Sequence, residues 1–318
     1  MYGFATLFLG QTMAALAQVF LLAVPPRLAV SWFPENEVNL ATSIAVSANN
    51  LGVAAGCALT PLMVRSKSMS NDIPRLLLIQ FIACLLVLVF TWFSLERFPP
   101  YTHSDNSEEN SAEQSKQLWK NKSFILMLIA YGTIMGAQCA IVSLLAQILI
   151  PPFSDVLDET YIGLIGSMML LVGVPASIGV GCYLDRTLNY RFACNLLFLS
   201  AFISVLGLYV STELKSLLGV IVFCLFFGIA SYAIAPAMFQ YASELFYPIS
   251  EIIPTGYLLT VGNIQGLILV ACMGWGENIS WNFTMRLPMA FLTLTMLVGA
   301  VAVSRVDGAL KRPATLLE

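Results

Sequence analysis

Two adjacent amides stand in the middle of a long apolar run, in "SIAVSANNLGVAAG" at residues 43 to 56. An amide that faced lipid without a hydrogen-bond partner would be costly, so neither Asn49 nor Asn50 is expected on the lipid side of a helix. The two side chains would lie about 100° apart on a helix, so one can face a central cavity while the other faces a neighbouring helix. Two roles therefore stay open: lining a solute path, and hydrogen bonding between helices at an average of about 0.6 kcal/mol.

A second polar group closes another apolar run, in "GCYLDRTLNY" at residues 181 to 190. Asp185 and Arg186 place an acid and a base at a helix end, and Gly181, one turn earlier, allows another helix to approach closely. Such a pair is either solvated charge or a bridge between helices. The single histidine, His103, falls in the longest polar segment, so no apolar run holds a histidine with an acid or nucleophile as partner. We therefore expect no enzyme, no cofactor and no metal site.

The composition identifies the elements that must position these side chains. The 318 residues are 58% hydrophobic and 10% charged, whereas an ordinary soluble domain is about 25% charged. Apolar runs of about 20 residues, each able to cross ~30 Å of hydrocarbon as a helix, recur along the chain. They are continuously apolar rather than alternating, which favours helices over a barrel. The sequence predicts an all-α polytopic membrane protein, and with a net charge of −3 and no basic stripe it does not indicate a nucleic-acid partner.

Nine transmembrane spans are predicted. They cover residues 4–32, 39–64, 74–95, 123–150, 161–183, 192–212, 217–245, 252–274 and 286–304. The proline, serine and mixed charge of residues 96–122 predict a flexible linker with a short amphipathic helix near its end. We therefore expect a partial helical bundle of three spans at 1–95, a cytoplasmic linker at 96–122, and a six-helix bundle at 123–318.

Lysine and arginine are distributed unequally between the two sides of the predicted membrane. One side, which includes the linker and the C-terminus, carries ten of them, and the other side carries five. Because basic residues favour the cytoplasmic side, the linker and C-terminus are expected in the cytoplasm and the N-terminus outside. The outward loop "GWGENISWNFT" holds two glycosylation sequons, at Asn278 and Asn282. We expect a multi-pass protein of the lipid bilayer, in the plasma membrane rather than an organelle.

Several stretches together carry a resemblance to a known family. "GCYLDRT" resembles the G-x-L-x-D-R motif of the major facilitator superfamily. The stretches "GQTMAALAQVFLLAVPPRLAVSWF", "NNLGVAAGCALTPLMV", "LMLIAYGTIMGAQCAIVSLLAQI" and "FQYASELFYPISE" are similar, in the same order and spacing, to the feline leukaemia virus subgroup C receptor (FLVCR) family of that superfamily. The nine spans would then be helices 4 to 12 of a twelve-helix carrier whose two halves are related by a pseudo-twofold axis.

This resemblance implies transport by alternating access. Gly181, Asp185 and Arg186 would form a motif that holds one gating conformation. The family is associated with choline and ethanolamine, and with haem. We expect facilitative transport of a small organic cation such as choline or ethanolamine. The alternatives are a haem exporter of the same family, and a non-transporting receptor or truncated product.

The resemblance also implies which residues line the path. Asn50 and Asn263 fall where choline carriers have glutamines on the fifth and eleventh helices, so each keeps the amide but is one methylene shorter. Cys139 falls where they have the seventh-helix tyrosine of an aromatic cage, and Tyr131 and Gln138 on the same helix remain as lining groups. The predicted spans hold no acid except Glu244, near a cytoplasmic end, and ion-coupled carriers usually need a buried acid. Uncoupled transport is therefore favoured.

Overall fold

The computed structural model describes residues 2–22, 24–34, 37–64, 69–94, 111–153, 157–247, 249, 251–279 and 285–307. Within these ranges the chain forms eleven helices and no strand. They are α1 (Tyr2–Leu22), α2 (Val24–Trp32), α3 (Val38–Met63), α4 (Met69–Ser94), α5 (Ser111–Lys120), α6 (Lys122–Phe153), α7 (Glu159–Thr187), α8 (Tyr190–Glu213), α9 (Leu217–Phe246), α10 (Ile252–Ile279) and α11 (Arg286–Ser304).

The predicted all-α membrane fold is confirmed. In the described part of the chain, eight helices are long and apolar enough to cross a membrane, and they coincide with the second to ninth predicted spans. The first predicted span, 4–32, is divided between α1 and α2. Pro25 and Pro26 lie at the start of α2, and proline there has no N–H to donate to the preceding turn, so it favours a helix start over continuation.

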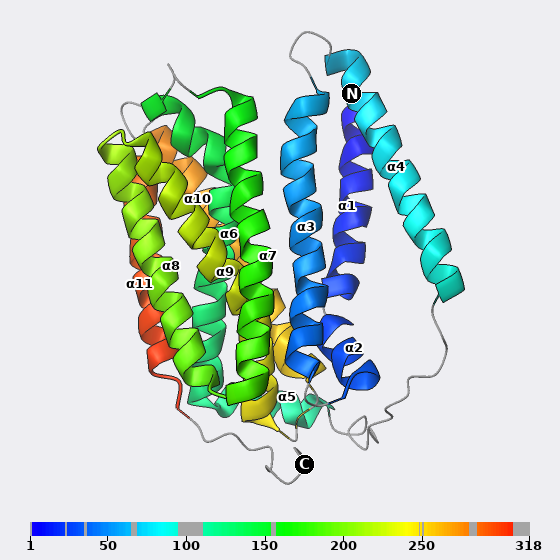
Figure 1. The fold of residues 1–318 in the computed structure, drawn as a ribbon, viewed down its shortest axis with the longest axis vertical. Coiled ribbons are helices and arrows are strands. Elements are labelled where there is room, and N and C mark those ends of the chain that lie inside the picture. The colour runs from blue at the N-terminus through cyan, green and yellow to red at the C-terminus, as the bar shows by residue number, and fades with distance from the viewer. Residues whose placement is uncertain are drawn as a thin grey trace.

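The six helices α6 to α11 form a closely packed bundle, and α3 lies antiparallel against the side of α7 (Figure 1). Within the bundle α6 packs on α10 and α9 packs on both α7 and α8. Phe124, Phe198 and Phe227 are wholly buried in its core. In contrast, α4 touches mainly α3, and its apolar window is nowhere buried within the chain. The α3–α7 contact therefore joins the N-terminal helices to the bundle.

Glycines set the spacing between α6 and α10. A Cβ added at Gly136 of α6 would lie 2.5 Å from Leu269 Cδ1 and 3.3 Å from the backbone oxygen of Gln265 on α10. On the other side of the interface, a Cβ at Gly262 would lie 3.0 Å from the ring of Tyr131. Small residues let membrane helices approach closely, and dispersion contacts then hold them together. This packing positions the α6 side chains that the sequence selects.

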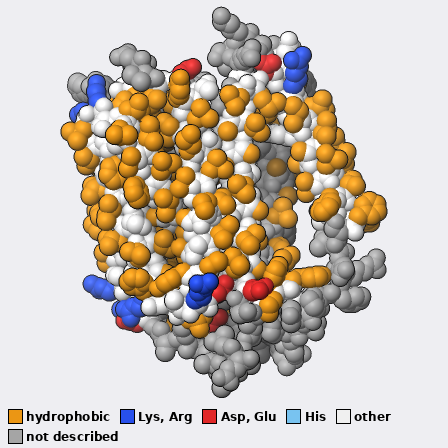
Figure 2. Space-filling model, viewed as in Figure 1, with side chains coloured by type: hydrophobic (Ala, Val, Ile, Leu, Met, Phe, Trp, Pro, Cys, Tyr) orange, Lys and Arg blue, Asp and Glu red, His pale blue; other side chains and the backbone are white. Residues whose placement is uncertain are grey.

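Charged side chains gather at the two ends of the molecule. Figure 2 shows an almost continuous hydrophobic wall between them. At one end α5, within the predicted linker, lies beneath α6 and α10. There Trp119 packs edge-on against Tyr257, with ring centroids 5.4 Å apart, and Ser115 Oγ lies 2.7 Å from the Tyr257 hydroxyl. The end of the linker region is thus attached to the six-helix bundle.

Candidate functional site

Asp185, near the C-terminal end of α7, caps the start of α3. Its Oδ1 accepts hydrogen bonds from the Asn39 backbone N–H at 3.2 Å and from Asn39 Nδ2 at 2.6 Å, and its Oδ2 accepts one from the Leu40 N–H at 3.0 Å. The first N–H groups of a helix have no partner within the helix, and its positive dipole end favours a carboxylate. A side chain from the six-helix bundle therefore performs the capping that usually comes from a residue next to the helix.

Two further hydrogen bonds join the same part of α3 to the bundle. The Tyr190 hydroxyl, at the start of α8, donates to Asn39 Oδ1 at 3.3 Å. Gln240 Nε2 of α9 donates to Thr42 Oγ1 at 2.7 Å, and both groups are buried. We call Asn39, Thr42, Asp185, Tyr190 and Gln240 the α3 latch. It ties α3 to three helices of the bundle at one end of the molecule.

The other two residues of the sequence motif have different surroundings. A Cβ at Gly181 would lie 2.5 Å from Ser43 Oγ and 3.1 Å from the Asn39 backbone oxygen, so only glycine admits α3 at this distance. Arg186 is exposed and forms no ion pair with any residue that the structure describes. The base that neighbours the motif in sequence, Arg191, is engaged elsewhere.

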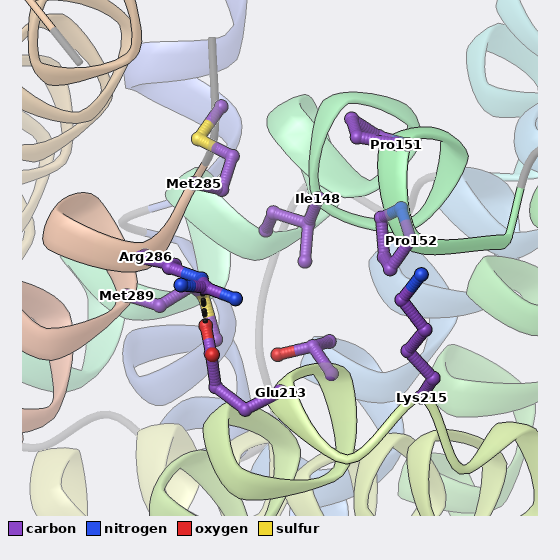
Figure 3. Close-up of a pocket in the computed structure, with 9 residues that line it drawn as sticks. Ile148, Pro151, Pro152, Glu213, Lys215, Met285, Arg286 and Met289 are labelled. Carbon is purple, nitrogen blue, oxygen red and sulfur yellow. Dashed lines mark ion pairs between the residues drawn. The ribbon is translucent and has the colours of Figure 1, made fainter. Parts of the chain in front are cut away.

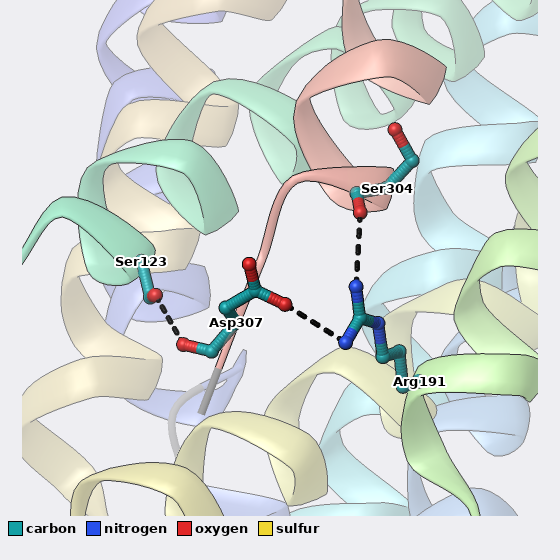
Figure 4. A network of polar contacts seen from close by, with 4 residues as sticks. All are labelled: Ser123, Arg191, Ser304 and Asp307. Atoms are coloured by element: carbon teal, nitrogen blue, oxygen red, sulfur yellow. Dashed lines mark hydrogen bonds and ion pairs between the residues drawn. The ribbon is translucent and has the colours of Figure 1, made fainter. Parts of the chain in front are cut away.

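Three ends of the six-helix bundle meet around Asp307, which pairs with Arg191 (Figure 4). Arg191 Nη1 pairs with Asp307 Oδ1 at 2.8 Å and its Nη2 donates to the Ser304 backbone oxygen at 3.5 Å. Ser123 Oγ, at the start of α6, donates to the Asp307 backbone oxygen at 2.5 Å. The pair is largely exposed, so it contributes at most about 1 kcal/mol.

Tyr131 and Gln138 occupy one face of α6, because residues seven apart lie on the same side of a helix. The Tyr131 ring lies 5.4 Å from the Phe239 ring of α9, and its hydroxyl lies 4.0 Å from Met135 Sδ. Gln138 is 9% exposed, and its Nε2 is buried with no hydrogen-bond partner in the described structure. A buried amide donor without a partner costs about 1–3 kcal/mol, so such groups are rare unless they have a role.

Cys139 of α6 lies at the α6–α10 interface, whereas Asn263 lies on an exposed face of α10. Cys139 is half-buried, and a Cβ at Gly266 of α10 would lie 3.2 Å from its sulfur. Asn263 is exposed, and its Nδ2 donates within α10 to the Leu259 backbone oxygen at 2.8 Å. The amide of α10 that lies against α6 is Gln265, whose Oε1 is buried without a partner beside Gly132.

Asn50 is buried on α3, whereas Asn49 next to it is exposed. Neither amide forms a hydrogen bond with a described residue. The amides that do join α3 to other helices are Asn39 and Gln240, in the α3 latch. The structure therefore brings Tyr131, Gln138 and Cys139 together on α6, and leaves Asn50 on a different helix.

The sequence analysis missed Tyr232 of α9. Tyr232 is 7% exposed and packs in one buried cluster with Ala54 of α3 and Leu170 of α7, with Cys57 of α3 against it. A Cβ at Gly173 of α7 would lie 2.8 Å from Tyr232 Cβ, so α7 needs glycine there. The only local signal is a tyrosine among small residues in "IASYAIAP".

The fold and site define a polytopic helical membrane protein in which two sets of helices meet along α3 and α7. The model of the Major Facilitator Superfamily matches residues 1–268. The chain belongs to this superfamily, as its D-R motif suggested.

Curated relatives narrow the comparison. The chain is 28% identical over 322 residues to the zebrafish (Danio rerio) "Choline/ethanolamine transporter flvcr2b", covering 97% of this chain and 65% of the relative. It is 27% identical to the human "Choline/ethanolamine transporter FLVCR2", covering 97% and 60%. A Caenorhabditis elegans "Uncharacterized MFS-type transporter" is 27% identical, covering 96% and 53%. The chain thus spans about half to two thirds of the length of these relatives, and the resemblance to the FLVCR family is confirmed.

Solved structures support the same fold. The crystal structure of the transporter FucP in its outward conformation matches with a TM-score of 0.67 and 16% identity, over 91% of this chain and 73% of that one. Similarity at this identity shows the fold alone.

Proposed function

We propose that this protein carries a small organic cation of the choline or ethanolamine type across a membrane by facilitated alternating access. The support is a superfamily whose members are transporters, relatives named as choline/ethanolamine transporters, and a buried amide at the centre of the fold. The proposed location is the plasma membrane. The measurement for this location is whether a glycosidase added to intact cells removes glycans from Asn278 and Asn282.

The observation that carries the proposal is Gln138. Its buried Nε2 has no partner in the described structure, on the same α6 face as Tyr131. Tyr232 adds a buried aromatic ring where α9 meets α3 and α7. Cation–π attraction is worth about 0.5–2 kcal/mol per well-placed ring, and an amide adds hydrogen bonding to a hydroxyl. We propose that Asn50 and Asn263 complete the polar path from α3 and α10.

We expect Gln138→Leu to lower choline and ethanolamine uptake while leaving the protein at least as stable. Loss of one hydrogen bond to the solute lowers Vmax/KM about tenfold, because 1.4 kcal/mol corresponds to a factor of ten. Stability is retained because leucine removes a buried donor that has no partner. The measurement is radiolabelled uptake into cells, together with thermal melting of the purified variant.

The control is Gln147→Leu, the same exchange on the exposed face of α6. It should change neither quantity. If Gln138→Leu melts well below the wild type and uptake falls only in proportion to folded protein, Gln138 is a structural amide. If the wild-type chain takes up neither solute above background, the proposed substrate class is wrong.

We also propose that the α3 latch holds one gating state. Its hydrogen bonds join α3 to α7, α8 and α9 at the end where α7 and α3 meet. A carrier that opens at this end must break all of them together.

A further inference from the structure

A cavity of 240 Å³ lies at the end of the bundle opposite the α3 latch, between the ends of α6 and α8 and the start of α11 (Figure 3). Its apolar wall includes Ile148, Pro152 and Met289. Its charged side chains are Glu213, Lys215 and Arg286, which come from the end of α8 and the start of α11. The cavity is smaller than the roughly 300–1,000 Å³ of clefts that enclose whole drug-sized ligands, so it suits a headgroup-sized ligand.

The cavity is lined by two cationic side chains and one anionic side chain, so its net charge is positive. Arg286 Nε pairs with Glu213 Oε1 at 2.9 Å, which orients the guanidinium and leaves its two terminal nitrogens available. Lys215 lines the same cavity and forms no ion pair with a described residue. These are two of only five basic residues predicted on this side of the membrane, and they lie far apart in the sequence. Their meeting at one cavity is a product of the fold.

The backbone at Lys215 forms the helix end that brings this cation to the cavity. Lys215 has a φ of 51°, in the left-handed region that favours glycine. The Ser216 N–H donates to the Ser211 oxygen at 2.9 Å and the Lys215 N–H to the Thr212 oxygen at 3.2 Å, which is the Schellman pattern at a helix end. Glycine is the usual residue at this position, so a Lys215→Gly variant fits this backbone without strain.

We propose that this cavity binds the phosphate of an anionic phosphate monoester, with the attached hydrocarbon along the apolar wall. The Arg286 fork can hold two phosphate oxygens, and Lys215 supplies a point charge to a third. The ends of membrane-spanning helices lie at the depth of lipid headgroups, which makes an anionic phospholipid one source of the phosphate. A water-soluble phosphate is the other source. The site lies apart from Gln138 and the α3 latch, and it is independent of the transported solute.

The test measures binding by the purified full chain in a neutral detergent, with three probes: dihexanoyl phosphatidic acid, inorganic phosphate and dihexanoyl phosphatidylcholine. We expect phosphatidic acid to bind and Lys215→Gln to raise its Kd about tenfold, as loss of one charge-assisted contact does. Glu213→Gln should lower the Kd, because it removes the negative charge beside Arg286. Lys215→Gly should raise the Kd like glutamine while fitting the left-handed backbone, which separates lost binding from lost folding.

The control is Arg75→Gln, an exposed basic residue of α4 that lies outside the cavity and has the same predicted side. It should leave the Kd unchanged. Binding of inorganic phosphate with the same response to Lys215→Gln identifies a soluble phosphate as the source, and binding of phosphatidic acid alone identifies a lipid headgroup. Equal binding of phosphatidylcholine, no binding of either phosphate probe, or an equal effect of Arg75→Gln would overturn the proposal.

Discussion

Replacing Gly228 with alanine is expected to prevent normal assembly of the six-helix bundle. A Cβ at this position of α9 would lie 2.0 Å from the Met169 backbone oxygen and 2.8 Å from its carbonyl carbon on α7. Backbone atoms cannot rotate away as a side chain can, so α7 and α9 would have to separate. Overpacking typically costs about 1–3 kcal/mol, and a clash with backbone belongs at the upper end of that range.

The measurement for Gly228→Ala is the yield of monodisperse protein after detergent extraction, with the melting temperature of what remains. The matched control is Gly179→Ala on α7, where a Cβ would meet nothing within 4 Å. That variant should extract and melt like the wild type. Normal melting of Gly228→Ala would show that α7 and α9 can shift apart without loss. The same α7–α9 contact positions Tyr232, because Gly173 of α7 packs directly against Tyr232 of α9.

Replacing Asp185 with alanine is expected to open the end of the molecule that the α3 latch closes. The change removes three hydrogen bonds to the start of α3 and the charge that faces its dipole. Such capping contacts are worth about 2 kcal/mol at their strongest, which corresponds to a shift of roughly 30-fold between closed and open states. Asp185→Asn keeps an acceptor oxygen without the charge and should have an intermediate effect.

The reporter for this opening is Ser43→Cys in a variant without other cysteines. Ser43 is 1% exposed and faces Gly181 across the α3–α7 contact, so a thiol there reacts with a membrane-impermeant maleimide only when the helices part. Asp185→Ala should increase the labelling rate in inside-out vesicles. The control is Asp307→Ala, which breaks the exposed ion pair with Arg191 at the same end and should leave labelling unchanged. Equal labelling with and without Asp185 would exclude a gating role for the latch.

Part of the site could be predicted from the sequence, because its signals are local. Asp185 stands at the end of a predicted span, and Gln138 and Tyr131 follow from the family resemblance, which assigns a path-lining role to their helix. The environment of Asn263 could not be predicted from such local signals. The resemblance predicts that this amide lines the path, and that role stays a prediction. In the structure the Asn263 side chain is exposed and bonded within α10, and Gln265 is the amide that lies against α6. Residues two apart lie on different faces, so the rotation of α10 decides which of them meets α6.

The sequence by itself determined the class of protein and its second to ninth spans, because transfer of each segment into lipid depends on that segment's own composition. The break between α1 and α2, which the prediction of one span at 4–32 missed, lies at two prolines. Only the tertiary structure decided that Asp185 caps a helix whose start lies 146 residues away, and that Tyr232 of α9 packs with Ala54 of α3 and Leu170 of α7. It also brought Lys215 and Arg286 to one cavity. These pairings depend on how rigid helices rotate and approach each other, and that is set by close packing at glycines from both partners rather than by any single segment.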